Sequence, residues 1–217
     1  IHTCTIYFSS LTFVFFLQIL RSHVPFNVRS RVESGHIDSV NEVRVCTVVF
    51  LGFPSLGMPK SGGAAESLAA VQSVVQAAQG RMHQDGGYFL QMRCDEKGYL
   101  ALCAFGLPGG AHEDSPSRGI HAALAVIPHL QRQGYAAVAG VTTGNLFCGV
   151  VGSSRRAEYT VFGDAINFAA RLMVRASKNT ELGSILCDET TRWMAAAVAD
   201  YTALDPISVK GRAQPLI

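Results

Sequence analysis

Asn167 and Arg171 stand four positions apart in the segment Asn-Phe-Ala-Ala-Arg. On an α-helix they share one face, one turn apart. Arginine offers a planar cationic fork suited to phosphate oxygens, and asparagine both donates and accepts hydrogen bonds around a ribose. Thr160, just upstream, is placed to stand beside them at the end of a strand. The spacing indicates a site for a phosphorylated, hydroxyl-rich ligand, although an exposed helix face with a surface salt bridge explains the spacing alone more simply.

The elements that must position these residues are indicated by the residues around them. A strand is expected at Ala136–Val141, a turn at Gly144-Asn145 and a second apolar strand at Leu146–Val151. A short β-rich segment, Glu158–Phe162, leads to a helix that begins at Gly163-Asp164. The helical spacing places Ile166, Ala169, Ala170 and Met173 on the core side, away from Asn167 and Arg171.

Composition limits the possible classes of protein. The chain has 217 residues, a hydrophobic fraction of 48% and a net charge of +2, which is too small to indicate a nucleic-acid partner. The six cysteines include no C-x-x-C pair, and three of them lie in apolar strand candidates, where a free thiol acts as a small hydrophobe. A reducing, cytoplasmic location fits this cysteine usage.

The start of the chain differs from the rest. Leu11–Leu20 is apolar but too short to span a bilayer unaided, so a membrane partner is not favoured. Residues 1–42 are interpreted as a leader or linker outside the fold, and residues 43–217 as one domain.

The remaining segments give the fold class. Strands are expected at Val43–Phe53, Gly87–Arg93, Tyr99–Phe105 and Ser184–Cys187, and a hairpin-like piece at Val209–Arg212. Helices are expected at Ala64–Ala78, ended by Gly80, at Ser117–Gln133, kinked by Pro128, and at Asp188–Ala197. This order predicts an α+β fold, an antiparallel sheet packed with helices.

Two motifs resemble those of the class III adenylyl and guanylyl cyclase catalytic domains, most closely the second catalytic domain of the soluble adenylyl cyclases. Glycines at 140, 144, 149 (one residue off the family spacing) and 152 precede E-Y-T-V-F-G-D-A-I-N-F-A-A-R, residues 158–171. The second motif, residues 95–109, is similar to the D-x-K-G-x-x-x-L-C-x-F-G-L-P-G hairpin of that domain. The resemblance covers about Val43 to Leu216, and it implies a ferredoxin-like sheet of the nucleotide cyclase type.

The resemblance also implies which part of the chemistry this chain lacks. In the family, two aspartates in one half of a paired site bind two divalent ions, Mg²⁺ or Mn²⁺. The matching positions here are Gly52 and Tyr99, neither of which offers a carboxylate, and Asp95 and Glu96 are interpreted as solvated turn residues. No metal ligand is therefore expected in this half, and the ions are expected on a partner half.

The complementary residues are present. By the resemblance, Lys97 and Thr160 read the adenine, Asn167 orients the ribose and Arg171 neutralises charge on the α-phosphoryl oxygens. Lys210 or Arg212 is expected to reach the β and γ phosphates, and the choice between them stays open.

The sequence thus predicts an adenylate cyclase domain, a lyase that converts ATP to 3′,5′-cyclic AMP and pyrophosphate in cyclic-nucleotide signalling. Activity requires a metal-bearing partner half, in the same chain or another. The alternative is a non-catalytic nucleotide-sensing or dimerisation module that regulates a partner cyclase half.

Overall fold

The chain forms two compact units in the computed structural model, Ile1–Val40 and Asn41–Ile217. The structure describes residues 10–24, 29, 33, 35, 41–56, 64–95, 98–153 and 155–205. In the first unit the apolar run forms helix α1 (Ser10–His23), and its side chains from Val14 to Arg21 are exposed. Across the described residues, no helix is both long and apolar enough to cross a membrane.

The second unit is built on one sheet with strand order β2-β3-β1-β4-β5. The first four strands along the chain are β1 (Glu42–Phe53), β2 (Tyr88–Asp95), β3 (Gly98–Phe105) and β4 (Val138–Ser153), of which β2 lies at one edge of the sheet. The last two are β5 (Arg156–Phe162), antiparallel to β4, and β6 (Ile185–Cys187), parallel to β4. Helix α3 (Ala64–Gln84) joins β1 to β2, and helix α4 (Ser115–Arg132) joins β3 to β4. The resulting β-α-β-β-α-β order, with β1 between β3 and β4, confirms the predicted α+β, ferredoxin-like sheet.

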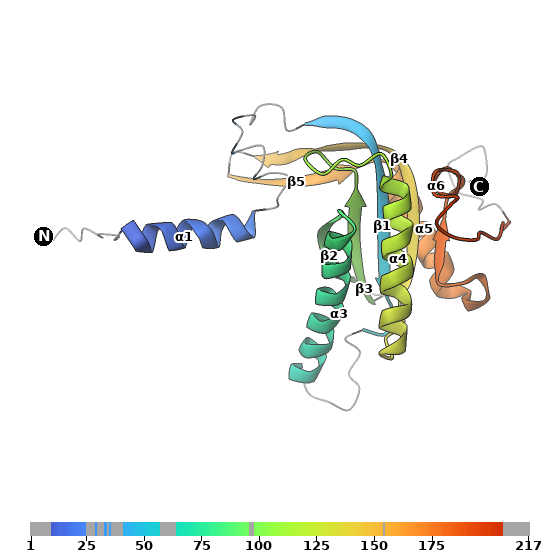
Figure 1. Ribbon diagram of the computed structural model, residues 1–217. Helices are drawn as coiled ribbons and strands as arrows, with labels where there is room; N and C mark the ends of the chain where they lie inside the picture. The colour runs from blue at the N-terminus through green and yellow to red at the C-terminus, as the bar shows by residue number, and fades with distance from the viewer. Residues whose placement is uncertain are drawn as a thin grey trace, which may run out of the picture. The chain divides into compact units, whose positions relative to one another are not determined.

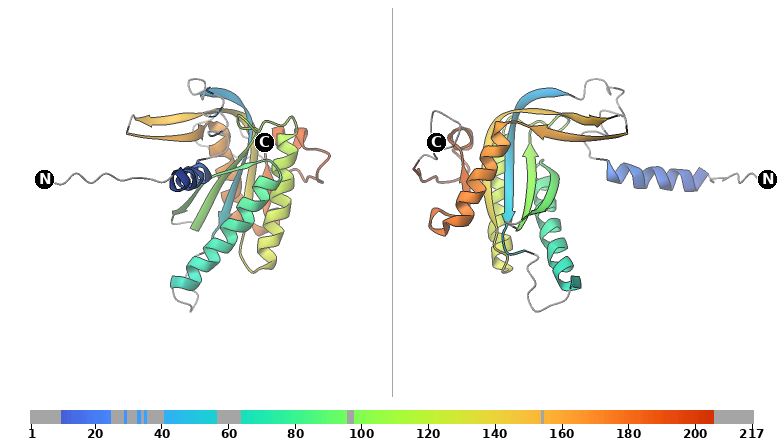
Figure 2. Two further views of the ribbon diagram at one scale, coloured as in Figure 1. Left: turned by 60° about the vertical axis from the view of Figure 1, so that its left-hand side comes forward. Right: turned by 180° about the vertical axis from the view of Figure 1, so that it is seen from behind.

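Helices cover both faces of this sheet (Figure 1). Helices α3 and α4 lie on one face, and helix α5 (Asp164–Lys178) packs on β4 and β1 from the other, as the view from behind shows (Figure 2). From Cys46 to Phe53, strand β1 is covered on both sides, and its successive side chains pack alternately on the two faces. Val49 and Leu51 join the cluster under α3 and α4, whereas Cys46 and Val48 join the cluster on the opposite face. This burial on both faces explains why the second half of β1, residues 46–53, is almost wholly apolar.

The turn predicted at Gly144-Asn145 is wrong. Strand β4 runs unbroken through both residues, because β1 is long enough to pair with it on each side of the expected turn. Gly144 pairs with Cys46, and Asn145 pairs with Val45. The reversal comes later, where Ser153 of β4 pairs with Arg156 of β5.

The stop predicted at Gly80 is also wrong, because α3 continues to Gln84. The extension buries Met82 completely, and burial of a large apolar side chain outweighs the cost of about 1 kcal/mol for a glycine within a helix.

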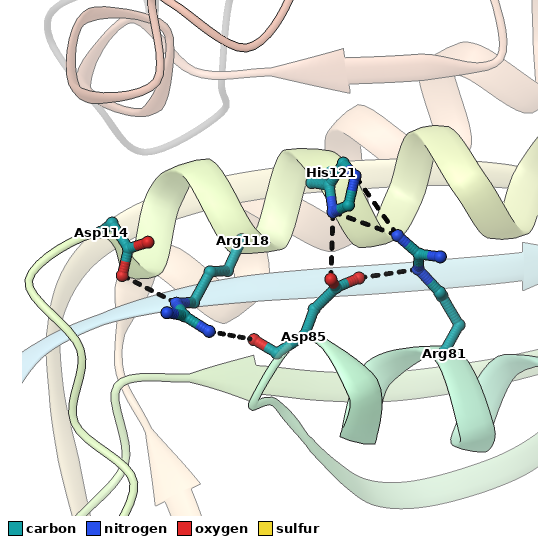
Figure 3. A network of polar contacts seen from close by, with 5 residues as sticks. All are labelled: Arg81, Asp85, Asp114, Arg118 and His121. Atoms are coloured by element: carbon teal, nitrogen blue, oxygen red, sulfur yellow. Dashed lines mark hydrogen bonds and ion pairs between the residues drawn. The ribbon is translucent and has the colours of Figure 1, made fainter.

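Polar contacts hold the end of α3 against α4 (Figure 3). Asp85 follows the helix, and its carboxylate accepts from Arg81 Nε at 2.8 Å and pairs with His121 Nδ1 at 3.0 Å. Arg118 Nη1 donates to the carbonyl oxygen of Asp85 at 3.3 Å, and Arg118 Nε donates to Asp114 at 2.7 Å. This network fixes the helical layer on the side of the sheet away from α5.

The remaining elements differ from expectation mainly at their ends. Helix α4 begins at Ser115, two residues earlier than expected, and continues past Pro128. Helix α6 (Glu189–Met194) is shorter than expected, with Asp188 as its N-cap. A short 3₁₀ helix, Thr180–Leu182, precedes β6. The hairpin-like piece expected at Val209–Arg212 lies outside the described residues.

Candidate functional site

Helix α5 carries the two residues singled out first. Its apolar stripe faces the sheet, where Ala169 and Met173 are buried as expected, while Ile166 and Ala170 are half-buried. Asn167 and Arg171 are exposed on the other side of the helix, one turn apart. The structure therefore places both side chains on one exposed stripe of a helix whose other side packs on the sheet. We call this stripe, Asn167 and Arg171, the free stripe of α5.

Within the described residues, the side chains of Asn167 and Arg171 form no hydrogen bond or ion pair. Other arginines in the same region are engaged. Arg175 Nη1 donates to the carbonyl oxygen of Asp205 at 2.8 Å, and Arg192 holds Glu189 through two bonds of 2.6 and 3.0 Å. A surface salt bridge, the simpler explanation for Arg171, would need an acidic partner, and the described part of the chain supplies none.

Three glycines let α5 rest directly on the sheet. A Cβ atom at residue 140 would overlap the carbonyl oxygen of Ala169 and lie 2.7 Å from the amide nitrogen of Met173. A Cβ atom at Gly144 would lie 3.3 Å from the Cβ of Ala165, and one at Gly52 would lie 2.5 Å from Met173 Sδ. These bare positions fix the height of α5, and with it the height of Asn167 and Arg171, above the sheet.

Thr160 lies on β5, which leads into α5 through Gly163. It is half-buried and pairs with Gly149 of β4. Its neighbours Tyr159 and Val161 pack on the core cluster, so strand alternation turns the Thr160 side chain to the opposite face of β5. Lys97, Lys210 and Arg212, the other expected ligand contacts, lie outside the described residues.

The two positions matched to metal ligands do not fit a divalent cation. Gly52 has no side chain, and Met173 closes over it from α5. Tyr99 is half-buried and packs on the cluster under α3 and α4. Asp95, in the hairpin, is exposed. In the described part of the chain, no three His, Cys, Asp or Glu side chains gather as a metal site would require.

The buried cysteines act as part of the core. Cys46 and Cys148 face one another across β1 and β4 with 3.8 Å between their sulfur atoms, and Cys103 is fully buried. The hydrogen bond with Cys148 and burial together raise the pKa of the Cys46 thiol, and burial raises that of Cys103, so both stay protonated and unreactive.

A cavity of about 770 Å³ lies between α5, β6, α6 and residues 200–205. Its α5 lining consists of Phe168, Leu172 and Arg175, and neither Asn167 nor Arg171 borders it.

Comparison with known proteins adds to this geometry. A sequence model of the family described as "Adenylate and Guanylate cyclase catalytic domain" matches residues 103–216. Adenylate cyclase type 10 of Oryctolagus cuniculus is 28% identical over 158 residues, which are 70% of this chain and 9% of that protein. The Homo sapiens protein of the same name is 26% identical over 179 residues, 79% of this chain and 10% of that protein. The chain thus spans about a tenth of the length of these relatives.

Solved structures of cyclases share the fold. The adenylyl cyclase CyaB from P. aeruginosa superposes with a TM-score of 0.68 at 19% identity, covering 81% of this chain and 92% of that one. The guanylate cyclase domain of RhGC from Catenaria anguillulae, in complex with GTP, superposes with a TM-score of 0.65 at 20% identity, covering 81% and 94%. Both adenylyl and guanylyl cyclases are therefore among the structural relatives.

Proposed function

The chain belongs to the adenylate and guanylate cyclase catalytic-domain family, and from this premise we propose that it forms the metal-less half of a paired adenylate cyclase site. In that role it converts ATP to 3′,5′-cyclic AMP and pyrophosphate together with a metal-bearing partner half. The observation that carries the proposal is the free stripe of α5. There Arg171 and Asn167 are held one turn apart on a packed helix and have no partner among the described residues.

Each residue has a role that follows from its chemistry. Arg171 places its fork against the α-phosphoryl oxygens, where negative charge grows in the transition state. Asn167 hydrogen-bonds the ribose and holds the 3′-hydroxyl in line with the α-phosphorus. Thr160 and Lys97 select adenine at its polar edge, and Lys210 or Arg212 holds the β and γ phosphates. The partner half supplies two Mg²⁺ or Mn²⁺ ions, which activate the 3′-hydroxyl and neutralise the phosphates.

The sheet face that carries α5 supports a paired arrangement. Helix α5 packs on β4 and β1, and in the described part of this unit no helix lies over β2 and β3 on that face (Figure 2). Leu90 and Leu100 are half-buried on that face, where they pack against the clusters that include Ala169 and Met173 of α5. A partner half seated on this side would bury both leucines and lie next to the free stripe of α5. A homodimer of this chain alone would contain no metal aspartate at either site.

The test mixes the full chain with a class III cyclase half that carries both metal aspartates, and it measures cyclic AMP from ATP with Mg²⁺ or Mn²⁺. We expect no product from the chain alone and turnover from the mixture. The control is the same partner half with both aspartates changed to asparagine, which should abolish the turnover.

Two results would contradict this proposal. Robust cyclic AMP formation by the chain alone would show that the metal positions are not Gly52 and Tyr99. A chain that binds the partner and changes the partner's own activity, with no activity that depends on Arg171, would identify the non-catalytic regulatory module instead.

A further inference from the structure

Thr142 lies in the middle of the part of β4 on which α5 packs. It lies on β4 between Gly140 and Gly144, and strand alternation puts all three on the face under the helix. Its side chain is completely buried. The hydroxyl Oγ1 donates to the carbonyl oxygen of Ala165, in the first turn of α5, at 2.7 Å. The glycines bring the helix close, and the threonine bonds to it.

This bond differs in kind from the contacts around it. The contacts of Ala169 with Gly140 and of Met173 with Gly52 are van der Waals contacts, which fix the height of the helix but resist sliding along the strand only weakly. A hydrogen bond of 2.7 Å is directional and therefore fixes one register. A buried hydroxyl without a partner is costly, so α5 cannot shift away from Thr142 without penalty.

We propose that Thr142 is a positioning residue, whose hydroxyl fixes the first turn of α5 on β4 and so sets where Asn167 and Arg171 stand against the nucleotide. This inference rests on the proposed function. The bonded carbonyl belongs to Ala165, two residues before Asn167 and six before Arg171. A slip of the first turn therefore moves both side chains together.

The reaction is sensitive to such a slip. A displacement of about 1 Å in the groups that hold a reacting phosphate costs on the order of 10²-fold in rate. Ground-state binding, which is spread over the whole nucleotide, changes much less. Loss of the Thr142 hydroxyl should therefore lower kcat and leave KM nearly unchanged.

The chain offers a matched control on the same strand. Thr143 is also buried, and its hydroxyl lies 3.0 Å from that of Thr47 and 2.8 Å from that of Thr191. Its side chain is on the opposite face of β4 and does not touch α5. Thr143→Val thus removes a buried hydroxyl from β4 by the same chemical change, without touching the helix that carries Asn167 and Arg171.

The experiment compares Thr142→Val, Thr142→Ser and Thr143→Val in two measurements. Amide hydrogen exchange of residues 164–170, measured in the chain alone, reports how stably the start of α5 is held. This measurement does not depend on catalysis. The values of kcat and KM for ATP, with the metal-bearing partner half present, report the consequence. We expect Thr142→Val to speed exchange in that turn and lower kcat by roughly 10- to 100-fold at nearly constant KM. Serine should restore both, and Thr143→Val should change neither.

Several results would overturn the inference. One such result is an unchanged rate of hydrogen exchange in α5 when Thr142 is replaced by valine. Another is a Thr143→Val variant that loses as much kcat as Thr142→Val when the two variants have the same melting temperature. If valine prevents folding, Thr142→Ala takes its place with the same expectations. If the unaltered chain is inactive with its partner, the proposed function fails, and hydrogen exchange alone still decides whether Thr142 anchors α5.

Discussion

The Sδ atom of Met173 lies 2.5 Å from the place that a Cβ atom of residue 52 would occupy. Gly52 is on β1 and Met173 is on the buried stripe of α5, so the helix closes over the strand at this point. A Cβ atom there would also lie 3.1 Å from a methyl group of Val138. The position that the family resemblance matches to a metal-binding aspartate is therefore filled by the packing of α5.

Gly52→Ala should destabilise the chain, because the added methyl group crowds the side chains of Met173 and Val138. Overpacking of this kind costs about 1–3 kcal/mol in the free energy of unfolding, measured by urea denaturation. The matched control is Gly80→Ala in α3, where nothing lies within 4 Å of the added atom. That change should stabilise the chain by about 0.5–1 kcal/mol. A Gly52→Ala chain as stable as the wild type would show that Met173 does not close the site.

Gly52→Asp should not create a metal site. The carboxylate would have to displace Met173, and Tyr99, the other matched position, offers no second one. Titration with Mn²⁺ followed by electron paramagnetic resonance should give the same free-ion signal for the variant and the wild type. Tight binding of Mn²⁺ by the variant would refute this prediction.

The free energy of unfolding should depend on pH through Asp188, the N-cap of α6. Burial raises the pKa of this carboxyl above its ordinary value of 3.8, against the opposing effect of hydrogen bonds from Thr191 and Thr143. The folded state holds the proton more tightly than the unfolded state, so protonation of Asp188 stabilises the fold. This contribution to the free energy of unfolding is fully present below pH 3.8 and is lost as the pH rises through the raised pKa.

Asp188→Asn tests this contribution, since asparagine caps a helix about as well and does not titrate. The free energy of unfolding of the wild type minus that of the variant should fall as the pH rises from 3.8 and then level off. Urea denaturation at pH steps up to 7 measures it. A difference that is constant, or that rises with pH, would contradict the assignment.

Most of the fold could be predicted because its signals are local and strong. The run rich in β-branched and other apolar residues at 43–53 and the helical spacing after Asp164 each identify one element, and both elements are found. The two errors arose where a contact distant in sequence overrides a local signal. Gly144 looks like a turn residue, but it is needed where Ala165 comes close. Gly80 looks like a helix stop, but Met82 is buried beyond it.

The site was predictable in part. The spacing of Asn167 and Arg171 placed them on one free stripe, and the structure shows both there. Thr142 was missed, although the pattern Gly-x-Thr-x-Gly, with its period of two, puts a hydroxyl between two bare positions of one strand face. The acceptor of that hydroxyl, the carbonyl oxygen of Ala165, belongs to a helix that begins more than twenty residues later. Only the packing of α5 on β4 reveals the pair.

Base choice tests the roles of Lys97 and Thr160. In the enzyme complemented with its partner half, the wild type should prefer ATP over GTP, because a lysine and a hydroxyl suit the polar edge of adenine. Lys97→Glu combined with Thr160→Cys should shift the preference toward GTP. The measurement is kcat/KM for both nucleotides, with Thr160→Cys alone as the intermediate case. Unchanged selectivity in the double variant would remove both residues from the base pocket.

Arg171→Ala should lower kcat of the complemented enzyme on the order of 10²–10⁴-fold and leave KM for ATP nearly unchanged. The reason is that the guanidinium acts on charge that develops only in the transition state. Arg171→Lys should recover little of the lost kcat, because a point charge cannot reproduce the planar fork of the guanidinium. Steady-state kinetics give both parameters, and a thermal melt confirms that each variant folds.

Arg175→Ala is the matched control, one turn further along the same helix. Arg175 already donates to the carbonyl oxygen of Asp205, so its loss should lower the melting temperature slightly and leave kcat within a few-fold of the wild type. If Arg171 made only a surface salt bridge, its alanine variant would lose less than about 1 kcal/mol of stability and keep its kcat, as the Arg175 variant should. A folded Arg171→Ala enzyme with near-normal kcat would therefore end the catalytic assignment of this residue.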